Sequence, residues 1–382
     1  MIYFPYYYHR SFNYNSTALV YCRLYKKEKG SCINATFQLS TAFIKNLQTV
    51  KTCVNFEQHN KNSQNKMKAA IRSKYGLPQV LSVKEVETPT AKDNEVLIKV
   101  HATTVNRTDC GILFGKPLLI RLFTGIFKPK LSITGTDFAG EIVATGIKVN
   151  SFKVGDKVMG FGGMGLGTHA QYISIPETKA ILTIPVNINY EQATASVEGA
   201  FYALDNVNKL NPKAGQKAMV NGATGAIGSA IVQFLKYYGL TVTATCSTEN
   251  INLVKSLGAD RIIDYKKIDF TKDSDQYDFV FDAVGKSTFV KCKPLLKNKG
   301  IYTSTDGFVN FFLSIVTPVF RGKKVVFTPP KNVKAGLNFI KQLLEKGNFI
   351  PVIDRRYPID KIVEAFTYAA SGKKVGNIII TM

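Results

Sequence analysis

The 382-residue sequence lacks any long apolar run. A helix needs roughly 18–20 consecutive apolar residues to cross a bilayer, so the sequence predicts no membrane-spanning helix. The run that comes nearest, 308–320, is interrupted by polar residues and a proline, at Asn310, Ser314, Thr317 and Pro318. We interpret it as a pocket wall, a partner-facing segment or a core element.

Closely spaced cysteines are also absent. The six cysteines are scattered, and none of them stands at C-x-x-C spacing. This pattern argues against a structural zinc site and against a small disulfide framework. Scattered free cysteines fit a reducing compartment, so the expected location is cytoplasmic.

Acidic residues are scarce. The chain has 27 Asp and Glu against 50 Lys and Arg, for a formal net charge of +23. Such a charge favours a phosphate-bearing ligand, a peripheral contact with an anionic membrane surface, or simply a lysine-rich solvated exterior. No recognised nucleic-acid-binding motif or dense basic stripe is present, so nucleic acid is not expected as a partner.

Residues 1–66 differ in composition from everything after them. They are rich in Tyr, Phe, Asn and Lys, and their only acids are Glu28 and Glu57. A basic, acid-poor segment is typical of targeting peptides, but this one has few arginines and no unbroken apolar core. We interpret it as a disordered or spurious extension before a true start at Met67, with a targeting segment as the alternative.

From Met67 the chain falls into two patterns. Short apolar runs separated by Gly, Pro, Asn and Asp turns continue to about residue 190 and predict a β domain. Alternating strands and helices follow and predict a doubly wound parallel sheet, so the fold class is α/β. The predicted strands are 68–73, 80–86, 95–104, 140–145, 157–161, 170–175, 217–221, 241–246, 261–264, 278–283, 300–304, 324–327 and 377–381, and two amphipathic helices are predicted at 333–346 and 359–371.

A glycine-rich run stands between the predicted strand 217–221 and a predicted helix, 227–238. It reads Gly222-Ala223-Thr224-Gly225-Ala226-Ile227-Gly228. A turn of this kind lets backbone amides approach a pyrophosphate, and the helix N-terminus adds partial positive charge. The usual spacing is G-x-G-x-x-G. Here Ala223 takes the first glycine position and Gly222 is an additional glycine, so the run predicts a dinucleotide site.

The end of the second strand of the predicted parallel sheet bears on which dinucleotide is bound. A carboxylate there usually accepts the ribose hydroxyls of NAD. This chain has Cys246-Ser247-Thr248 instead. Small hydroxyl residues leave room for a 2′-phosphate, so Ser247 and Thr248 favour NADPH over NADH. Tyr265 is expected to flank the same group, whereas Glu249 would repel a phosphate if it pointed inward.

Several further motifs follow one another in a familiar order. They are Lys68-Ala69-Ala70 leading to Gly76, Val105-Asn106-Arg107-Thr108-Asp109, Gly135-Thr136-Asp137-Phe138-Ala139-Gly140, Phe152-Lys153-Val154-Gly155-Asp156-Lys157-Val158 and Asp282-Ala283-Val284-Gly285. From Met67 to its end the chain resembles the medium-chain dehydrogenase/reductase superfamily. Within it, the motifs are similar to those of the zinc-independent quinone oxidoreductase (zeta-crystallin-like) branch.

The resemblance implies a particular domain organisation. Residues 67–190 together with 331–382 would form a GroES-like β domain, which is the catalytic domain. Residues 191–330 would form a Rossmann domain that binds NADP. The dinucleotide site would include Val284 and Gly285, the substrate would bind in the cleft between the domains, and the protein would be a homodimer.

The resemblance also bears on metal binding. Zinc-dependent relatives carry a ligand cysteine where this chain has Asn106, and a G-H-E motif where it has Gly135-Thr136-Asp137. Asn106 and Thr136 are poor zinc ligands, and the four-cysteine lobe of those relatives is missing. We therefore expect no metal site, and we expect Asp137 to make a structural hydrogen bond. Cys110 has no accompanying set of ligands.

Without zinc, nothing polarises a simple carbonyl, so reduction of a quinone or a conjugated enone by NADPH is the expected reaction. By resemblance, Asn106 is the candidate catalytic residue, positioning substrate and nicotinamide ribose rather than transferring protons; a turn asparagine is the alternative. Asp109 is expected to cap a helix or serve as a hinge. Residues 110–125 contain no tyrosine, which leaves the proton to water. The rival function is a non-catalytic dinucleotide-binding or structural protein of the same fold.

Overall fold

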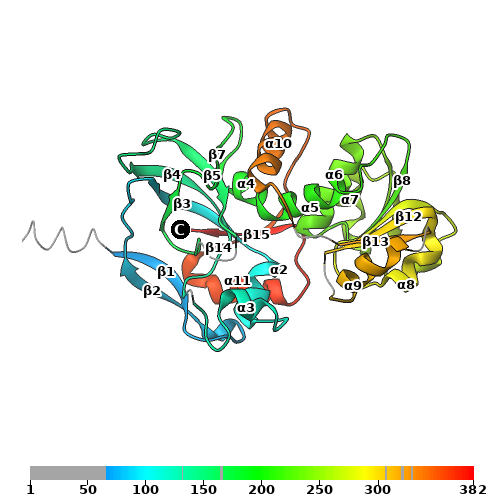
Figure 1. Cartoon of the computed structure of the whole chain (residues 1–382), viewed down its shortest axis with the longest axis horizontal. Helices are drawn as coiled ribbons and strands as arrows, with labels where there is room; N and C mark the ends of the chain where they lie inside the picture. Colours follow the sequence, from blue (N-terminus) through cyan, green and yellow to red (C-terminus); the bar gives the residue numbers. More distant parts are fainter. Residues whose placement is uncertain (1–65, 131, 164–166, 306–307, 320–321, 328–329) are drawn as a thin grey trace, which may run out of the picture. The chain divides into compact units, whose positions relative to one another are not determined.

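The computed structural model describes residues 66–130, 132–163, 167–305, 308–319, 322–327 and 330–382 (Figure 1). Apart from residue 66, the segment interpreted above as an N-terminal extension lies outside these ranges. Every helix within them is too short or too polar to cross a bilayer.

One part of the structure is built mainly on antiparallel strand pairs; the pair of Ile353–Pro358 with Asn377–Thr381 is parallel. These strands are β1 (Lys66–Arg72), β2 (Leu81–Glu87), β3 (Glu95–Val105), β4 (Asp137–Thr145), β5 (Lys157–Phe161), β6 (Tyr172–Pro176), β7 (Ala180–Thr183), β14 (Ile353–Pro358) and β15 (Asn377–Thr381). β1 and β2 form a hairpin, and the others form a sheet of order β14-β15-β3-β4-β5-β7, with β6 paired to β3. Val96, Ile98 and Val100 of β3 are all buried in one cluster, as a strand with one face on the core requires. The predicted GroES-like β domain is confirmed.

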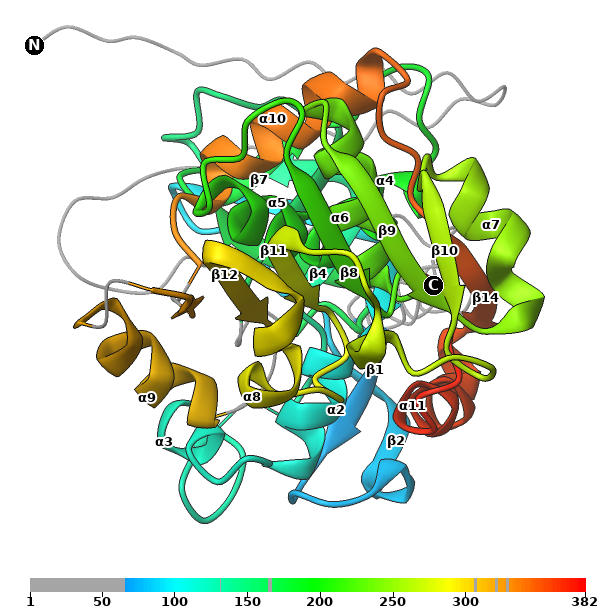
Figure 2. The same cartoon turned by 90° about the vertical axis from the view of Figure 1, so that its right-hand side faces the viewer.

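The second sheet is parallel throughout. Its strands are β8 (Lys217–Asn221), β9 (Thr241–Cys246), β10 (Arg261–Asp264), β11 (Tyr277–Asp282), β12 (Leu296–Ser304) and β13 (Lys324–Val326). Their order is β10-β9-β8-β11-β12-β13, and Figure 2 shows the three strands β8, β9 and β10 side by side. The chain runs outward from β8 to β10 and then resumes beside β8 with β11. This is the order of a doubly wound Rossmann sheet, and its switch point lies between β8 and β11.

Helices pack on both sheets, and those on the parallel sheet cover both of its faces. The helices are α2 (Arg107–Phe114), α3 (Ile120–Thr124), α4 (Tyr190–Ala195), α5 (Glu198–Asn208), α6 (Ala226–Tyr237), α7 (Ile251–Ser256), α8 (Phe289–Cys292), α9 (Phe308–Val316), α10 (Val333–Glu345) and α11 (Ile362–Ala370). Ala218 and Val220 of β8 share a core with α5 and α6, whereas Met219 packs on the opposite face with α8. Burial on both faces explains why these strands are continuous apolar runs in the sequence.

The C-terminal segment divides between the two cores. Leu337, Ile340 and Leu344 of α10 pack in the cluster that contains α5 and α6. β14 and β15 instead extend the antiparallel sheet, and α11 packs against α2. Within 331–382, β14, α11 and β15 thus pack with the GroES-like sheet, whereas α10 packs in a cluster that contains α5 and α6 and also Met159 of β5 and Leu182 of β7.

The apolar segment expected as wall, partner surface or core contains α9. Val309, Phe312 and Ile315 of this helix are exposed, and Val319 beyond it is exposed as well. Most of its large apolar side chains therefore do not enter a core. Of the three expectations for this segment, a pocket wall and a partner-facing surface remain.

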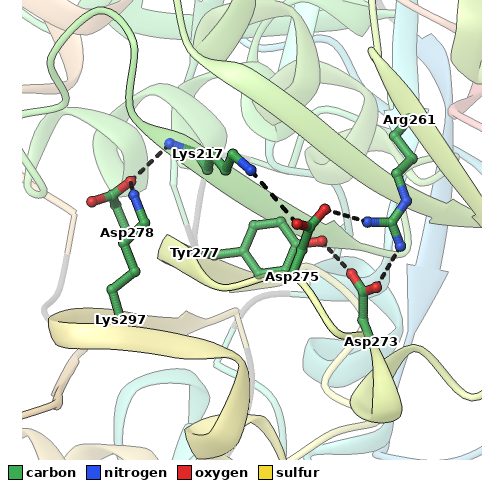
Figure 3. Close-up of polar contacts among 7 residues, drawn as sticks. All are labelled: Lys217, Arg261, Asp273, Asp275, Tyr277, Asp278 and Lys297. Carbon is green, nitrogen blue, oxygen red and sulfur yellow. Dashed lines mark hydrogen bonds and ion pairs between the residues drawn. The ribbon is translucent and has the colours of Figure 1, made fainter.

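A polar network joins the amino-terminal ends of the parallel strands (Figure 3). Its members are Lys217, Arg261, Asp273, Asp275, Tyr277, Asp278 and Lys297. Arg261 pairs with both Asp273 and Asp275, and the Tyr277 hydroxyl donates to Asp273. Burial tends to raise the pKa of Asp273, but the hydrogen bonds from Arg261 and Tyr277 outweigh it and hold that pKa below its usual value.

We predict that Arg261→Met destabilises the fold, because the Asp273 side chain is only 5% exposed and would lose its cation. The free energy of unfolding in urea should fall by about 1–3 kcal/mol at neutral pH, toward the lower figure because Arg261 itself is partly exposed. Because Asp273 titrates below its unfolded value, the deficit should shrink as the pH drops below about 4. Lys346→Met, at an exposed position after α10, is the matched control. Equal stability of the two variants would contradict the prediction.

Candidate active site

The glycine-rich turn connects β8 to α6. Gly222 has a φ of +82°, a conformation that side chains disfavour. Its amide donates to the Thr245 hydroxyl at 3.0 Å, and the amide of Ala223 donates to the Thr245 carbonyl at 3.0 Å. Ala223 is fully buried. Gly222 is therefore the glycine that the turn requires, and this explains why the sequence can carry alanine at the next position.

The other two glycines of the turn play different roles. A methyl group on Gly228 would lie 2.1 Å from the carbonyl oxygen of Gly222, so only glycine permits this contact between helix and strand. On Gly225 the nearest atom would be 3.9 Å away, so space is open in front of it. Gly225 caps α6 without a side chain, and the first-turn amides of Ala226 and Ile227 have no partner inside the helix. The turn thus has the geometry expected of a phosphate-binding cradle.

The loop after β11 lies beside this turn. The Asp282 carboxylate accepts hydrogen bonds from the amides of Val284 at 3.3 Å and Gly285 at 3.1 Å. A Cβ on Gly222 would lie 2.4 Å from Val284, which places the two loops in contact. Arg107 of α2 donates to the Val284 carbonyl at 3.1 Å. The structure therefore brings Val284 and Gly285 to the predicted dinucleotide site.

The two hydroxyl residues after β9 each have a carboxylate partner. The Thr248 hydroxyl donates to Asp264 at 2.6 Å, and this hydrogen bond lowers the pKa of Asp264. Its proton is therefore already committed. The Ser247 hydroxyl accepts from the side-chain amide of Asn250 at 2.9 Å, and its own hydrogen bond to Glu249 helps to lower the pKa of that carboxyl. A 2′-phosphate would compete with Glu249 for the Ser247 proton.

Glu249, the residue expected to repel a phosphate if it pointed inward, is paired instead. Lys266 lies 2.9 Å from its carboxylate, and the hydrogen bond from Lys266 lowers the pKa of Glu249 to about 2. Tyr265 follows β10, and its amide donates to the Cys246 carbonyl at 3.1 Å. The Tyr265 side chain is exposed. The structure thus brings Tyr265 to the end of β9, near Ser247.

Asn106 lies at the end of β3, where α2 begins. Its backbone amide donates to the Asp109 carboxylate at 2.8 Å, so Asp109 is a helix-capping residue, as expected. The side-chain nitrogen of Asn106 donates to Thr104 at 2.7 Å and to Glu198 at 3.3 Å. Its side-chain oxygen accepts from Lys374 at 3.2 Å. The carboxamide is therefore held from three sides.

Three buried acids surround this point. Burial raises the pKa of Asp109 well above its usual value, and the nearby Glu198 raises it further. Burial and the charge of Asp137 raise the pKa of Glu198 to about 7. Burial also raises the pKa of Asp137, to about 6. The Asp137 carboxylate accepts hydrogen bonds from Thr103, Thr104 and Thr194. Asp137 thus makes the structural hydrogen bonds expected of it.

Two further groups near the site are structural. Both ring nitrogens of His169 are engaged, with the Thr134 hydroxyl at 2.8 Å and the Thr104 carbonyl at 2.9 Å. Burial lowers the pKa of His169 to about 4, so the ring is neutral. Burial raises the pKa of the Cys110 thiol to about 12, so the thiol is protonated at neutral pH. Among the described residues, no three His, Cys, Asp or Glu side chains converge as a metal site would require.

Comparisons with known proteins agree with this geometry. Residues 92–186 match the alcohol dehydrogenase GroES-like domain, and residues 257–380 match the family described as zinc-binding dehydrogenase. The chain is 33% identical to the chloroplast envelope quinone oxidoreductase homolog of Arabidopsis thaliana, over 78% of this chain and 92% of that protein. It belongs to the medium-chain dehydrogenase/reductase superfamily, in the quinone oxidoreductase branch.

Two more proteins similar to this medium-chain dehydrogenase/reductase support the same assignment. The NADPH-dependent alkenal/one oxidoreductase of Arabidopsis thaliana is 30% identical over 92% of this chain and 88% of its own length. The quinone oxidoreductase structure from Coxiella burnetii aligns with a TM-score of 0.73 at 25% identity, covering 83% of this chain and 99% of that one. As a member of this branch, the chain is an oxidoreductase with a nicotinamide dinucleotide cofactor.

The sequence did not single out Glu198 or Lys374. Glu198 carried a usable signal, because it is an acid within the small and apolar run 193–204. Lys374 carried none, because it is one of 50 basic residues and stands beside another lysine. Only the folded chain brings both side chains to Asn106.

We predict that Gly225→Ala and Gly228→Ala separate binding from folding. The Gly225 variant should fold normally, because a methyl group there meets open space. It should weaken dinucleotide binding about 10- to 100-fold by displacing a phosphate from the turn amides. The Gly228 variant should lose about 1–3 kcal/mol of stability through the backbone clash. Cofactor fluorescence titration and thermal unfolding measure the two effects. Unchanged affinity in the Gly225 variant would contradict the cradle.

Proposed function

We propose that this chain reduces quinones or α,β-unsaturated carbonyls by hydride transfer from NADPH, without zinc. The observation that carries the proposal is the chemistry around Asn106. By resemblance, Asn106 stands where zinc-dependent relatives carry a ligand cysteine, and here three buried acids and Lys374 lie around it. The relatives named for quinone and alkenal/one reduction support the same class of reaction.

The donor set around Asn106 fits a zinc ion poorly. Zinc needs thiolate, imidazole or carboxylate lone pairs that converge on one point. The oxygen of Asn106 instead faces the ammonium of Lys374 at 3.2 Å, and a cation there would repel a metal ion. The carboxylate of Asp137 is occupied by threonine donors. These contacts support a reaction that proceeds without Lewis-acid catalysis by zinc.

The residues present fit NADPH. When bound, this cofactor supplies a hydride to an electron-poor carbon. The first-turn amides of Ala226 and Ile227 would hold its pyrophosphate, and the open space at Gly225 leaves room for the phosphates. Ser247 would donate to the 2′-phosphate. Asn106 would position the nicotinamide ribose and the substrate, and water would supply the proton.

A substrate screen tests the proposal. Oxidation of NADPH should be followed with quinones, enones, simple ketones and, in reverse, alcohols with NADP⁺. We expect turnover with quinones or enones that a metal chelator leaves unchanged. Activity on alcohols only, and only with added zinc, would overturn the proposal. Binding of NADPH without turnover on any of these compounds would instead indicate the non-catalytic dinucleotide-binding protein.

Replacing Ser247 tests the preference for NADPH. In Ser247→Asp the new carboxylate would repel a 2′-phosphate and accept the ribose hydroxyls of NADH. The ratio of kcat/KM for NADPH over NADH should fall by about 10- to 100-fold. Ser256→Asp, at the exposed end of α7, adds the same charge and should leave the ratio unchanged. If both variants keep the wild-type ratio, Ser247 does not face the 2′-phosphate.

A further inference from the structure

We infer that Lys374 is a positioning residue of the active site, because its ammonium holds the Asn106 carboxamide against the carboxylate of Glu198 and beside the glycine-rich turn. The kinetic part of this inference rests on the proposed function. The structural part rests on the contacts alone.

Lys374 lies in the loop between α11 and β15. Its ammonium donates to the Asn106 side-chain oxygen at 3.2 Å and to the Gly376 carbonyl at 2.6 Å. The Gly376 amide in turn donates to the Thr224 carbonyl at 2.7 Å, and Gly376 forms a β-bridge with Gly225. One side chain thus links the candidate catalytic residue to the backbone that would carry the cofactor phosphates.

The ammonium also decides which way the carboxamide points. An ammonium can only donate hydrogen bonds, so the atom of Asn106 that faces it must be the oxygen. The amide nitrogen must then face Thr104 and Glu198, at 2.7 Å and 3.3 Å. A carboxylate on one side and a cation on the other fix the orientation, because a flipped amide would oppose a donor to a donor.

The charges around Lys374 come from three elements. Asp109 and Cys110 face it from α2, Glu198 from α5 and Asp354 from β14. Burial lowers the pKa of Lys374 to about 8, while the surrounding acids act in the opposite direction. The group is therefore mostly charged at neutral pH and loses its charge as the pH rises through about 8. Lys373, its neighbour in sequence, is exposed.

Loss of the ammonium should release the carboxamide. A displacement of about 1 Å in a positioned group can lower a rate about 100-fold. The loss should therefore appear mainly in kcat and less in cofactor affinity, because the turn amides would remain in place.

The kinetic test compares Lys374→Met with Lys374→Arg and with the control Lys373→Met. The methionine variant should lose about 10- to 100-fold in kcat, with a smaller change in the NADPH dissociation constant. The arginine variant should recover part of the kcat. We expect the wild-type kcat to decline as the pH rises through about 8. The arginine variant should not show this decline, because arginine stays protonated. The control should match the wild type.

Wild-type kcat in Lys374→Met would overturn the inference. So would an alkaline decline that is the same in the wild type and in Lys374→Arg, because the titrating group would then be another one.

A second measurement does not depend on turnover. If the wild type binds NADPH but reduces no quinone or enone, the proposed function fails and the positioning contact can still be tested by urea unfolding. Lys374→Met, Glu198→Gln and the double variant should be compared between pH 7 and 8, between the pKa values of the two groups. We expect the double variant to be more stable than the sum of the single changes, because neutralising Glu198 removes the acid left without its cation. Simple additivity would overturn the inference.

Discussion

The close approach of α6 to the end of β8 is the constraint on which the rest of the site depends. Gly228 lies so near the carbonyl of Gly222 that no side chain fits between them. This contact fixes where the helix begins, and therefore where its first amides point. It also leaves the backbone of Thr224 and Gly225 in contact with Gly376. Gly376 directly precedes β15, which belongs to the other sheet. The predicted phosphate-binding turn and the junction between the two sheets thus have one origin.

Much of the fold could be predicted because burial leaves a clear mark on sequence. The strands 217–221, 241–246 and 261–264 are observed with the predicted bounds, since each is an apolar run ended by residues that turn. β14 was missed, because Ile353–Pro358 is charged and half exposed and shows no apolar alternation. The packing partners of α10 could not be derived from its sequence for a similar reason. Its apolar stripe shows that one face is buried, but not against which helix.

The site was predictable only where its residues are close together in sequence. Glycine spacing revealed the turn, and the strand that follows led to Ser247. Asn106, by contrast, meets Glu198 across 92 residues and Lys374 across 268 residues, and no local pattern records such pairs. The turn itself departs from the usual spacing at Ala223. The backbone shows why, because the strained conformation falls one residue earlier, at Gly222.

The contacts of Arg107 and Gly376 attach the glycine-rich turn to the part of the chain that builds the other sheet. Arg107 holds the carbonyl of Val284 on one side of the cradle, and Gly376 holds the carbonyl of Thr224 on the other. Both residues belong to the part of the chain that builds the GroES-like sheet. Both donate hydrogen bonds to backbone carbonyls in loops of the parallel sheet. A rotation of one sheet against the other would have to stretch these two attachments together. The glycine-rich turn predicted to bind the cofactor is therefore also a place where the parts of the chain that build the two sheets are held together.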